Sequence, residues 1–551
     1  MKKKVRKYLQ EALGGDLPEY QIERSKLKVH GELTTNLAMI LAKERKQNPR
    51  QLAQEIVSHL SRHADFFEKI EVAGAGFINF TLKKSVWQES LKELATVDWR
   101  SLVTRSGEGK KALVEFISGN PTGPLHVGNA RGGPLGDVIA SLLQAIGYEV
   151  TREYYINDIG GQIDHLGAGI LYEYLKLFGI DPGSEPPQYK GAYVHDLAEK
   201  AKEKFARRFI DTPREEAISV LGPYGVELVL EWIRSSCEKI GIRFDSWVHE
   251  KGILASETNK TLQSLEAKKV VQEKEGALWF APKDEFLEDR EAVLRRSDGR
   301  PTYFANDLAY HALKYRRGFD FMVNVWGANH HGHLPRMNAG VSALGFDPEK
   351  LHVVFYQTVR LKRGGEIVAM SKREGNLITV EEVVDEVGKD ALRFFLLMRA
   401  AESHLDFDLD LAKRHTQENP VYYVQYAHAR LASIFRKAEN QGISMTADPH
   451  LTRLDLPEEI ELIRLLHEFP EEVERAANSL EPHRIPFYLL ELAKAFQSYY
   501  ARAKEDKRYW ILGTDIDTTR AKLYLGAILK KTLAQGLELI GVSAPEVMDS
   551  E

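Results

Sequence analysis

Residues 113–133 read LVEFISGNPTGPLHVGNARGG. The stretch begins with an apolar run over 113–117 and then breaks at 118–124, where glycine and proline exclude a long helix. Apolar residues recur at helical spacing over 138–146, and a second apolar run covers 148–156. Strand, glycine-rich turn, helix and strand together predict a βαβ unit. Open α/β sheets bind ligands at the carboxyl edge of their strands, and a helix amino terminus at that edge offers free N–H groups to a phosphate.

The composition predicts a soluble, globular, cytoplasmic protein. The chain has 551 residues, of which 43% are hydrophobic and 28% are charged, and this length predicts roughly two to four domains. No apolar run reaches the length of a membrane span, and the first residues lack the apolar core of a signal peptide. The single cysteine, Cys237, excludes an internal disulfide framework and fits a reduced compartment. Because the net charge is −5, any nucleic acid must be held by local basic patches and stacking groups.

Changes in pattern along the chain predict three domains. Residues 1–107 are expected to form a small α/β domain that ends in a polar, glycine-containing linker. Residues 108–408 are expected to form a doubly wound, Rossmann-like parallel-sheet domain, split by a charged, helical insertion at about 165–300. An independent domain is the alternative interpretation of that insertion. Strand signals return at 321–326, and residues 409–551 predict an all-α helical bundle.

Two short motifs favour phosphate chemistry. His126 follows the glycine-rich turn, where an imidazole can donate to phosphate oxygens as negative charge builds up. Residues 364–373 place adjacent glycines and a small hydroxyl before Lys372, which suits a loop that lays cations on a polyphosphate. The alternatives are a capped helix start with an incidental histidine and a solvated surface hairpin. The occurrence of both motifs in one predicted sheet favours the functional interpretation.

This pair of motifs resembles the signatures of class I aminoacyl-tRNA synthetases, a His-x-Gly-His motif and a Lys-Met-Ser-Lys-Ser loop. Within that class the chain is similar to the arginyl-tRNA synthetase family over almost its whole length. The stretches that carry the resemblance are 114–128, 155–162, 303–307 and 541–546. Two positions depart from the signatures: Asn129 stands where the second histidine is usual, and Ala369 where the first lysine is usual. The second lysine of the loop, Lys372, is kept.

The resemblance implies an aminoacyl-tRNA ligase that works in two steps. ATP activates L-arginine to arginyl-adenylate, and the arginyl group then passes to the 3′-terminal adenosine of tRNA(Arg), with bound tRNA required for activation. His126, Asn129 and Lys372 are the expected catalytic residues, because they would stabilise the pentacoordinate phosphate. Magnesium is expected to enter with ATP, held by phosphates and water rather than by a protein cage. The residues expected to bind ATP are Pro124, His126, Gly128, Asn129, Gly327, Asn329, Met370, Ser371 and Lys372.

An arginine pocket needs carboxylates, because a guanidinium group binds them in bidentate geometry and an α-ammonium group needs an acceptor. Tyr303 and Asp307 lie four residues apart, so a helix would place both on one side. By similarity to the family, they frame the guanidinium group. The complete set implied by the resemblance is Glu115, Ser118, Asn120, Tyr303, Asp307 and His330. The alternatives are a surface carboxylate at a strand end for Glu115 and a core aromatic for Tyr303.

The histidines of 327–333 also suit a zinc site, but no cysteine lies near and the HExxH pattern is absent. The preferred interpretation, by resemblance, is a glycine turn at a strand end, where Gly327 and Asn329 touch the ribose of adenosine. No metal ligand is therefore predicted in the protein.

Aromatic residues beside basic ones in the carboxy-terminal domain indicate contacts with RNA, since unpaired bases stack on aromatic rings. Core packing is the alternative for each of them. The resemblance assigns this domain to the anticodon and the amino-terminal domain to the outer corner of the tRNA. The residues expected to bind tRNA are Asn36, Tyr422, Tyr426, Tyr500 and Trp510. A monomer with no membrane partner is expected. The rivals are another class I synthetase or nucleotidylyltransferase, and a non-catalytic RNA-binding paralogue.

Overall fold

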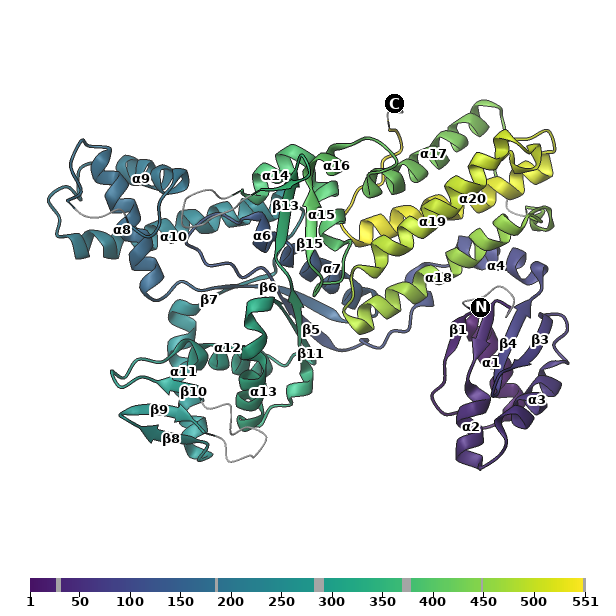
Figure 1. Ribbon diagram of the computed structural model, residues 1–551, viewed down its shortest axis with the longest axis horizontal. Helices are drawn as coiled ribbons and strands as arrows, with labels where there is room; N and C mark the ends of the chain where they lie inside the picture. The colour runs from purple at the N-terminus through teal and green to yellow at the C-terminus, as the bar shows by residue number, and fades with distance from the viewer. Residues whose placement is uncertain (26–30, 184–186, 282–291, 369–377, 447–448, 549–551) are drawn as a thin grey trace. The chain divides into compact units, whose positions relative to one another are not determined.

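Strand β5 (Lys111–Glu115) is the middle strand of a five-stranded sheet in the computed structural model. The other strands are β6 (Glu149–Ile156), β7 (Ser246–His249), β11 (Phe321–Gly327) and β12 (Leu351–Tyr356). Their order is β12-β11-β5-β6-β7, and all neighbouring strands are parallel (Figure 1). The structure describes residues 1–25, 31–183, 187–281, 292–368, 378–446 and 449–548.

The order of the strands marks where a ligand can bind. The chain passes from β5 to β6 and β7 on one side, and returns to β11 and β12 on the other side. The direction of winding therefore reverses between β5 and β11, and in open α/β sheets a crevice forms at such a point, outside the carboxyl ends of the strands. This parallel sheet confirms the predicted α/β class.

The strand ends two residues earlier than its apolar run indicates. Ile117 and Ser118 adopt φ angles of 66° and 41°, which a strand cannot contain and which side chains other than glycine rarely adopt. The backbone therefore leaves the sheet directly after Glu115. Such strained conformations cluster at functional sites, where the surrounding structure imposes them.

Two helices follow this turn, α6 (Val127–Ala130) and α7 (Gly132–Ala145). Helix α7 is buried along most of its length and packs against β5, β6 and β11. A Cβ atom at Gly136 would lie 2.2 Å from the ring of Phe116, so only glycine permits this close approach of helix and sheet.

Arg131, between these helices, is fully buried and joins two loops, one at residue 357 and the other at residues 399–403. Its guanidinium group donates to the carbonyl oxygens of five residues at 2.6–3.2 Å. These residues are Gln357, Arg399, Ala400, Ala401 and Ser403. Burial lowers the pKa of Arg131 to about 10, so the guanidinium group stays charged at neutral pH.

We expect Arg131→Met to lower the free energy of unfolding by about 3 kcal/mol or more, because several buried carbonyl groups lose their donor. Urea unfolding followed by fluorescence measures this change. Arg399→Ala is the matched control, since the Arg399 side chain is exposed, and it should change stability by no more than about 0.5 kcal/mol. Equal urea unfolding midpoints for the two variants would show that the hydrogen bonds of Arg131 contribute nothing to stability.

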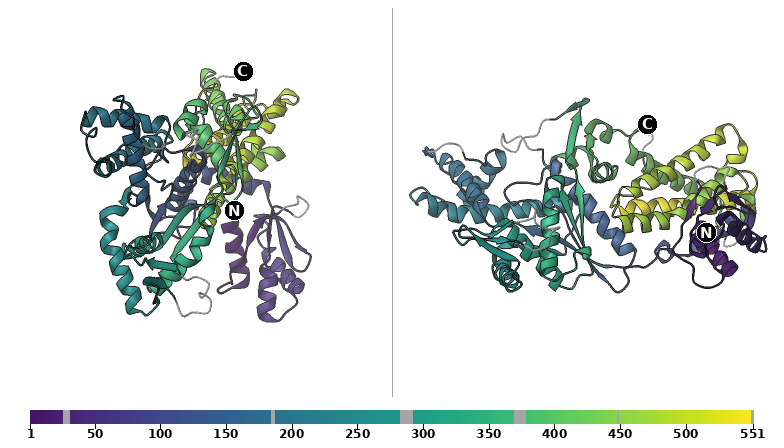
Figure 2. Two further views of the ribbon diagram at one scale, coloured as in Figure 1. Left: turned by 60° about the vertical axis from the view of Figure 1, so that its left-hand side comes forward. Right: turned by 60° about the horizontal axis from the view of Figure 1, so that its bottom comes forward.

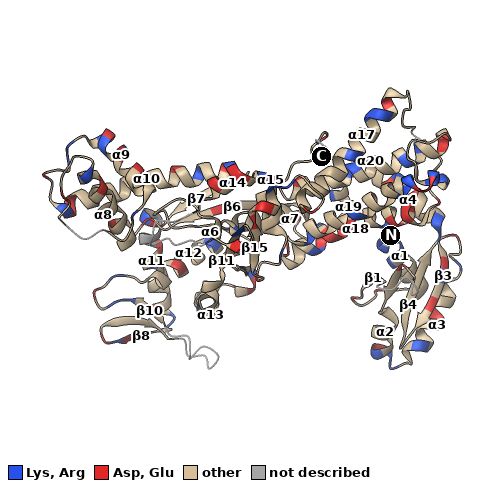
Figure 3. Ribbon diagram, turned by 45° about the horizontal axis from the view of Figure 1, so that its top comes forward, with Lys and Arg blue, Asp and Glu red and all other residues tan. Residues whose placement is uncertain are grey.

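The stretch predicted as an insertion contains two parts. Helices α8 (Gly161–Lys176), α9 (Ala192–Phe205) and α10 (Arg214–Lys239) form one cluster (Figures 1 and 2). In the ribbon of Figure 3, Lys and Arg positions (blue) and Asp and Glu positions (red) are interspersed along these helices. A second part comprises α11 (Glu250–Ala267) and an antiparallel sheet. Its strands are β8 (Val271–Lys274), β9 (Ala277–Phe280) and β10 (Ala292–Arg295). Between the two parts, β7 joins the central sheet, so this stretch also supplies a strand of that sheet.

Helix α12 (Tyr303–Arg316) connects that small sheet to β11. It packs on α11 and on α13 (Leu334–Ala343) through an apolar core that contains Leu308 and Met337. The 3₁₀ helix η3 (Ala328–His333) lies between β11 and α13. These elements place α12 and η3 at the carboxyl edge of the sheet.

A three-stranded sheet follows, in the order β14-β13-β15. Its strands are β13 (Val359–Arg363), β14 (Glu366–Ile367) and β15 (Leu405–Asp408). Gly364 and Gly365 make the turn of the predicted hairpin with φ angles of 61° and 83°. Apolar residues at helical spacing over 380–401 predict one helix, but the structure has two, α14 (Val380–Val387) and α15 (Lys389–Leu397), because Gly388 adopts a φ angle of 82°.

The chain forms two compact units. One contains residues 1–102, 430–470 and 492–532, and the other contains residues 103–429, 471–491 and 533–551. Within the first unit, the amino-terminal residues form an antiparallel sheet in the order β1-β2-β4-β3 (purple in Figure 2). Its elements are α1 (Lys2–Leu13), β1 (Ile22–Arg24), β2 (Leu33–Thr35), α2 (Leu37–Arg45), α3 (Pro49–Leu60), β3 (Phe67–Ala73), β4 (Phe77–Leu82), α4 (Lys84–Thr96) and α5 (Trp99–Leu102).

Beyond Leu409 the described residues form helices and no strand, as the sequence predicts. The helices are α16 (Leu409–Lys413), α17 (Pro420–Asn440), α18 (Pro457–Ser479), α19 (Arg484–Ala501) and α20 (Ile516–Leu539). Gly536 lets α20 approach α19, since a Cβ atom there would lie 2.5 Å from the side chain of Leu489.

Candidate active site

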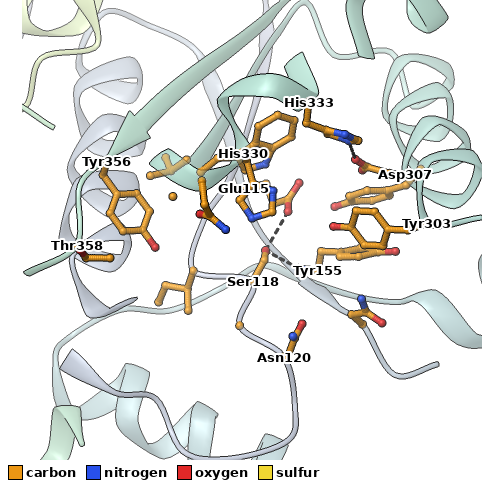
Figure 4. A pocket seen from close by; sticks show the side chains of 18 residues that line it. Glu115, Ser118, Asn120, Tyr155, Tyr303, Asp307, His330, His333, Tyr356 and Thr358 are labelled. Carbon is orange, nitrogen blue, oxygen red and sulfur yellow. Dashed lines mark hydrogen bonds and ion pairs between the residues drawn. The ribbon is translucent and has the colours of Figure 1, made fainter. Parts of the chain in front are cut away.

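A cavity of about 310 Å³ opens at the carboxyl ends of β5 and β11. Eight of the predicted site residues line it: Glu115, Ser118, Asn120, Tyr303, Asp307, Gly327, Asn329 and His330. They come from the turn after β5, from α12 and from η3. Figure 4 shows Tyr303 and Asp307 on one side, Tyr356 and Thr358 on the opposite side, and Glu115 between them. The fold therefore brings together residues that lie far apart in the sequence.

Glu115 is buried at the end of β5, with 6% of its surface exposed. The hydroxyl of Ser118 donates to Oε1 of Glu115 at 2.9 Å, and Nζ of Lys314 donates to Oε2 at 2.5 Å. The backbone N–H of Tyr155 donates to Oγ of Ser118 at 3.1 Å. These contacts hold the strained turn and fix the carboxylate of Glu115 at the edge of the cavity.

Asp307 lies between two imidazoles. Its Oδ1 lies 3.1 Å from Nδ1 of His311, and its Oδ2 is bonded to Nε2 of His333. Burial alone would raise the pKa of Asp307, but His311 and His333 together hold that pKa well below its usual range. Asp307 is therefore an anion at neutral pH, and it faces the cavity beside the half-exposed ring of Tyr303.

Two stacked rings form a rigid wall of the cavity. The rings of Tyr155 and Tyr310 are nearly parallel, with centroids 4.4 Å apart. The hydroxyl of Tyr310 donates to Oε1 of Glu153 at 2.7 Å. Glu153 is fully buried in β6 and also binds Arg317 at 2.6 Å. This pairing satisfies the buried charge and fixes the two rings.

The histidines of η3 close another side. His330 lines the cavity, and burial, together with the neighbouring imidazole of His333, lowers the pKa of His330, which favours its neutral form. Asn329 is exposed. Gly327 ends β11, where a Cβ atom would lie 2.8 Å from Oδ1 of Asn329, so a larger residue would displace that amide.

His126 occupies the N-cap position of α6. Its neighbours pair with the segment that follows the second motif: the N–H of Val127 donates to the carbonyl of Ile378, and that of Val380 donates to the carbonyl of Leu125. A Cβ atom at Gly128 would lie 3.1 Å from Nδ1 of His126, so a larger residue there would shift the imidazole. The first motif is thus joined in space to residues 378–380.

The other predicted ATP ligands have different positions. Pro124 precedes α6 in the turn. Asn129 lies within α6, and its side chain is outside the described part of the chain. Met370, Ser371 and Lys372, with Ala369, also lie outside the described residues.

Sequence reasoning missed three residues that support this site. His311 and Lys314 lie on α12, and Asn324 lies in β11; each has less than 2% of its surface exposed. The signal was present in the sequence. Residues 307, 311 and 314 are ionisable and fall on one helix side, and a polar residue interrupts the apolar strand 321–327. Buried polar groups at such positions indicate a functional or strained site.

The residues predicted to bind tRNA are partly engaged within the protein. Asn36 is the N-cap of α2, and its Oδ1 accepts from the backbone N–H of Gln21 at 3.3 Å. Tyr422 is 9% exposed, and its ring lies nearly parallel to those of His415 and Tyr426, at centroid distances of 5.8 and 5.7 Å. Little of the Tyr422 ring is left to meet a base, whereas Tyr426 is half-buried.

The other two predicted aromatic residues, Tyr500 and Trp510, lie in the compact unit that contains residues 492–532. The guanidinium group of Arg430 lies over the ring of Tyr500, 4.8 Å from its centroid. Trp510 is 42% exposed, its Nε1–H donates to the carbonyl of Ala503, and Lys507 lies over its ring. Trp510 therefore presents an aromatic face beside a cation.

Two further properties of the described residues concern partners. They contain no group of three or more His, Cys, Asp or Glu side chains placed to hold a metal ion. None of their helices is both long and apolar enough to cross a membrane.

Comparison with known proteins identifies relatives over the whole chain. Three family models match: "Arginyl tRNA synthetase N terminal domain" over residues 1–82, "tRNA synthetases class I (R), catalytic domain" over 93–404, and "DALR anticodon binding domain" over 424–548. The arginine–tRNA ligase of Syntrophotalea carbinolica is 44% identical, and the match covers 100% of both chains. That of Carboxydothermus hydrogenoformans is 43% identical, over 96% of this chain and 94% of the relative. The solved structure of Thermus thermophilus arginyl-tRNA synthetase matches with a TM-score of 0.78 and 27% identity, over 100% of both chains. The chain therefore belongs to the arginyl-tRNA synthetase family of class I aminoacyl-tRNA synthetases.

Proposed function

We propose a mechanism, at the level of residues, for this arginine–tRNA ligase. The observation that carries it is a pair of carboxylates, the buried Glu115 and the partly exposed Asp307, in one cavity at the carboxyl edge of the sheet. L-Arginine carries a cation at each end, so two separated carboxylates match its charge pattern. Glu115 and Ser118 receive the α-ammonium group, with Asn120 beside them. Asp307 and Tyr303 receive the guanidinium group.

His330 borders the space between the two ends of the substrate. Because its imidazole is favoured in the neutral form, it can accept or donate a hydrogen bond without repelling the cationic substrate. We assign it to the arginine site for that reason. The stacked rings of Tyr155 and Tyr310 provide the apolar wall against which the methylene groups lie.

The turn and α6 bind ATP in this proposal. The carboxylate of arginine attacks the α-phosphorus, the bond to the β-phosphate oxygen breaks, and arginyl-adenylate and pyrophosphate form. His126, Asn129 and Lys372 stabilise the negative charge of the pentacoordinate phosphate. Pro124, Gly128, Met370 and Ser371 shape the phosphate site, and Gly327 and Asn329 contact the adenosine. Magnesium enters as the ATP complex, bound mainly by phosphates and water.

Transfer to tRNA completes the reaction. The 2′-hydroxyl of the terminal adenosine attacks the arginyl carbonyl, the bond to the adenylate phosphate breaks, and AMP leaves. No covalent bond to the protein forms, so catalysis rests on positioning and electrostatic stabilisation. We infer a cytoplasmic monomer that needs bound tRNA to activate arginine. The domain limits at 107 and 408, and the insertion at about 165–300, stay predictions.

ATP–pyrophosphate exchange tests the activity directly. We expect exchange with L-arginine in the presence of tRNA(Arg). We also expect a loss of about 10³-fold or more in kcat/KM with L-citrulline, which has the shape of arginine without its charge, because the carboxylate of Asp307 would be left unpaired. Absence of exchange with and without tRNA would refute the ligase activity. Exchange with lysine but not with arginine would refute only the specificity.

A contact with tRNA is proposed for Asn36, Tyr422, Tyr426, Tyr500 and Trp510. A contact through Tyr422 would use the small exposed part of its ring, in a cavity of about 550 Å³ that His415, Tyr422 and Gln425 line together with the cation of Lys389. An aromatic wall beside a cation suits an unpaired base. Trp510 offers the other exposed ring.

We expect Trp510→Ala and Tyr426→Ala each to weaken tRNA binding by about 5- to 100-fold, because each stacked base contributes about 1–3 kcal/mol. Filter binding with labelled tRNA(Arg) measures this effect, while the KM for arginine should not change. Phe487→Ala is the control, because Phe487 is an exposed aromatic residue outside the predicted set. Equal tRNA affinity in all three variants would exclude stacking at Trp510 and Tyr426.

A further inference from the structure

Helix α12 carries a row of ionisable side chains on its buried side. Asp307, His311 and Lys314 follow one another at spacings of four and three residues and so share one side of the helix. His311 is 1% exposed and Lys314 is 0% exposed. Burying such groups is unfavourable unless each is paired and hydrogen-bonded. The hydrogen-bond partners of these three side chains therefore determine their role.

The partners form an unbroken chain of contacts between the carboxylates of Glu115 and Asp307. Nζ of Lys314 donates to Oε2 of Glu115 at 2.5 Å and to Oδ1 of Asn324 at 2.8 Å. Nδ2 of Asn324 lies 2.7 Å from Nε2 of His311. Nδ1 of His311 lies 3.1 Å from Oδ1 of Asp307 and 2.8 Å from the backbone carbonyl oxygen of Asp307. Three buried side chains thus connect Glu115 with Asp307.

The direction of each hydrogen bond in this chain follows from Lys314. An ammonium group only donates, so Asn324 presents its oxygen to Lys314 and its amide nitrogen to His311. Nε2 of His311 then accepts, and the proton of this ring lies on Nδ1, which faces Asp307. The chain therefore holds His311 as a neutral imidazole that donates to Asp307.

The two carboxylates consequently differ in charge balance. The charge of Glu115 is matched by the permanent cation of Lys314, and its other oxygen accepts from Ser118. Asp307 is met by imidazoles and by no lysine or arginine in the ion pairs of the described residues. A guanidinium group placed in the cavity is attracted more strongly to Asp307 than to the neutralised pair.

This difference matters because arginine has a cation at both ends. A cavity with two equivalent carboxylates would accept arginine in either direction, and only one direction brings the substrate carboxylate toward α6. We propose that Lys314 is a positioning residue, which neutralises Glu115 and orients His311 through Asn324, and thereby sets the direction in which arginine binds. This inference rests on the proposed arginine-binding role of the cavity.

Lys314→Met tests one end of the chain, because methionine keeps the length of the side chain and removes its charge. Glu115 then becomes a second uncompensated anion, so arginine also binds in the reversed, unproductive direction. We expect kcat and KM for L-arginine in ATP–pyrophosphate exchange to fall together by about tenfold. The inhibition constant of butylguanidinium, a probe that carries only the guanidinium end, should also fall by about tenfold.

Asn324→Asp tests the contact with His311, and we expect it to change the binding of butylguanidinium in the opposite direction. The new carboxylate still accepts from Lys314, but it also accepts from Nε2 of His311 and so favours the imidazolium form. The added cation beside Asp307 should raise the inhibition constant of butylguanidinium by about tenfold and raise the KM for arginine. Because the new carboxylate pairs with both of its neighbours, this variant tests the proposal even if the Lys314 variant does not fold.

Leu308→Ala is the matched control, since Leu308 is a buried apolar residue of the same helix and lies outside the chain of contacts. It should lower stability without changing kcat, the KM of arginine or the inhibition constant of butylguanidinium. A raised KM with unchanged kcat and unchanged butylguanidinium binding in Lys314→Met would overturn the positioning role. So would a change of the same sign in the Lys314 and Asn324 variants.

The unmodified protein separates this inference from the proposed function. If it supports ATP–pyrophosphate exchange with arginine, and the variants keep the kcat, the KM and the butylguanidinium inhibition constant of the unmodified protein, only the role of Lys314 is wrong. If it fails to exchange with arginine in the presence of tRNA, the proposed function is wrong.

Discussion

Asp307→Ala should reduce kcat/KM for L-arginine by about 30- to 3,000-fold, because truncating one partner of a buried charge pair costs about 2–5 kcal/mol. Asp307 is an anion in a largely buried position, and the imidazoles that face it hold its orientation. Without its carboxylate, the guanidinium group of arginine would lose its solvating water and gain no anion in return.

Asp307→Asn sharpens this result. Asparagine keeps the shape and the hydrogen-bonding oxygen, so a large loss in this variant assigns the effect to charge rather than to packing. The KM for ATP should stay within about twofold in both variants, since Asp307 lies in the arginine part of the cavity. ATP–pyrophosphate exchange with both substrates varied measures these constants. If Asp307→Asn retains full kcat/KM for arginine, Asp307 does not bind the guanidinium group.

His126→Ala should lower kcat for adenylate formation by about 10²- to 10³-fold, the usual loss when one donor to a developing oxyanion is removed. His126 stands at the amino-terminal end of α6, and its neighbours pair with the segment that follows the loop of Lys372. In the proposed mechanism, this position places the imidazole where negative charge grows on the phosphate.

The effect of His126→Ala should fall on the chemical step alone. The rate of adenylate formation in a single turnover should show the loss, while tRNA affinity in filter binding should be unchanged. His59→Ala, an exposed histidine of α3, is the control and should keep full activity. A fully active His126→Ala protein would exclude His126 from catalysis. Stabilisation of the phosphate would then rest on α6 and the loop of Lys372.

Much of the catalytic fold could be predicted from local patterns. The glycine-rich turn between two apolar runs predicts β5, α7 and β6, and the structure contains them. The apolar period also predicts a helix over 457–478, and α18 occupies Pro457–Ser479. Such elements are readable because their apolar period is long and is bounded by turn residues.

Other elements depend on partners that a sequence does not reveal. Strand β7 has four residues within a charged, helical stretch, and it becomes a strand by pairing with β6, some 90 positions earlier. The strand β5 stops at Glu115 because of the φ angles of Ile117 and Ser118, which the packing around the turn imposes and no propensity predicts.

The same limit applies to the site. Spacing alone indicates that Tyr303 and Asp307 share a side of a helix, and both line the cavity. Spacing also places His311 and Lys314 on a common side, but it does not say that Glu115 and Asn324 lie opposite. The contact between Lys314 and Glu115 joins residues 199 positions apart, so its chemistry is visible only in the folded chain.

The most direct test is a crystal structure of the protein with a stable analogue of arginyl-adenylate, such as the arginyl sulfamoyl ester of adenosine. We predict the guanidinium group within hydrogen-bonding distance of Asp307, the α-ammonium group at Glu115 and Ser118, and the sulfamoyl group at the amino terminus of α6 beside His126. A guanidinium group at Glu115, or an analogue bound outside this cavity, would contradict the account.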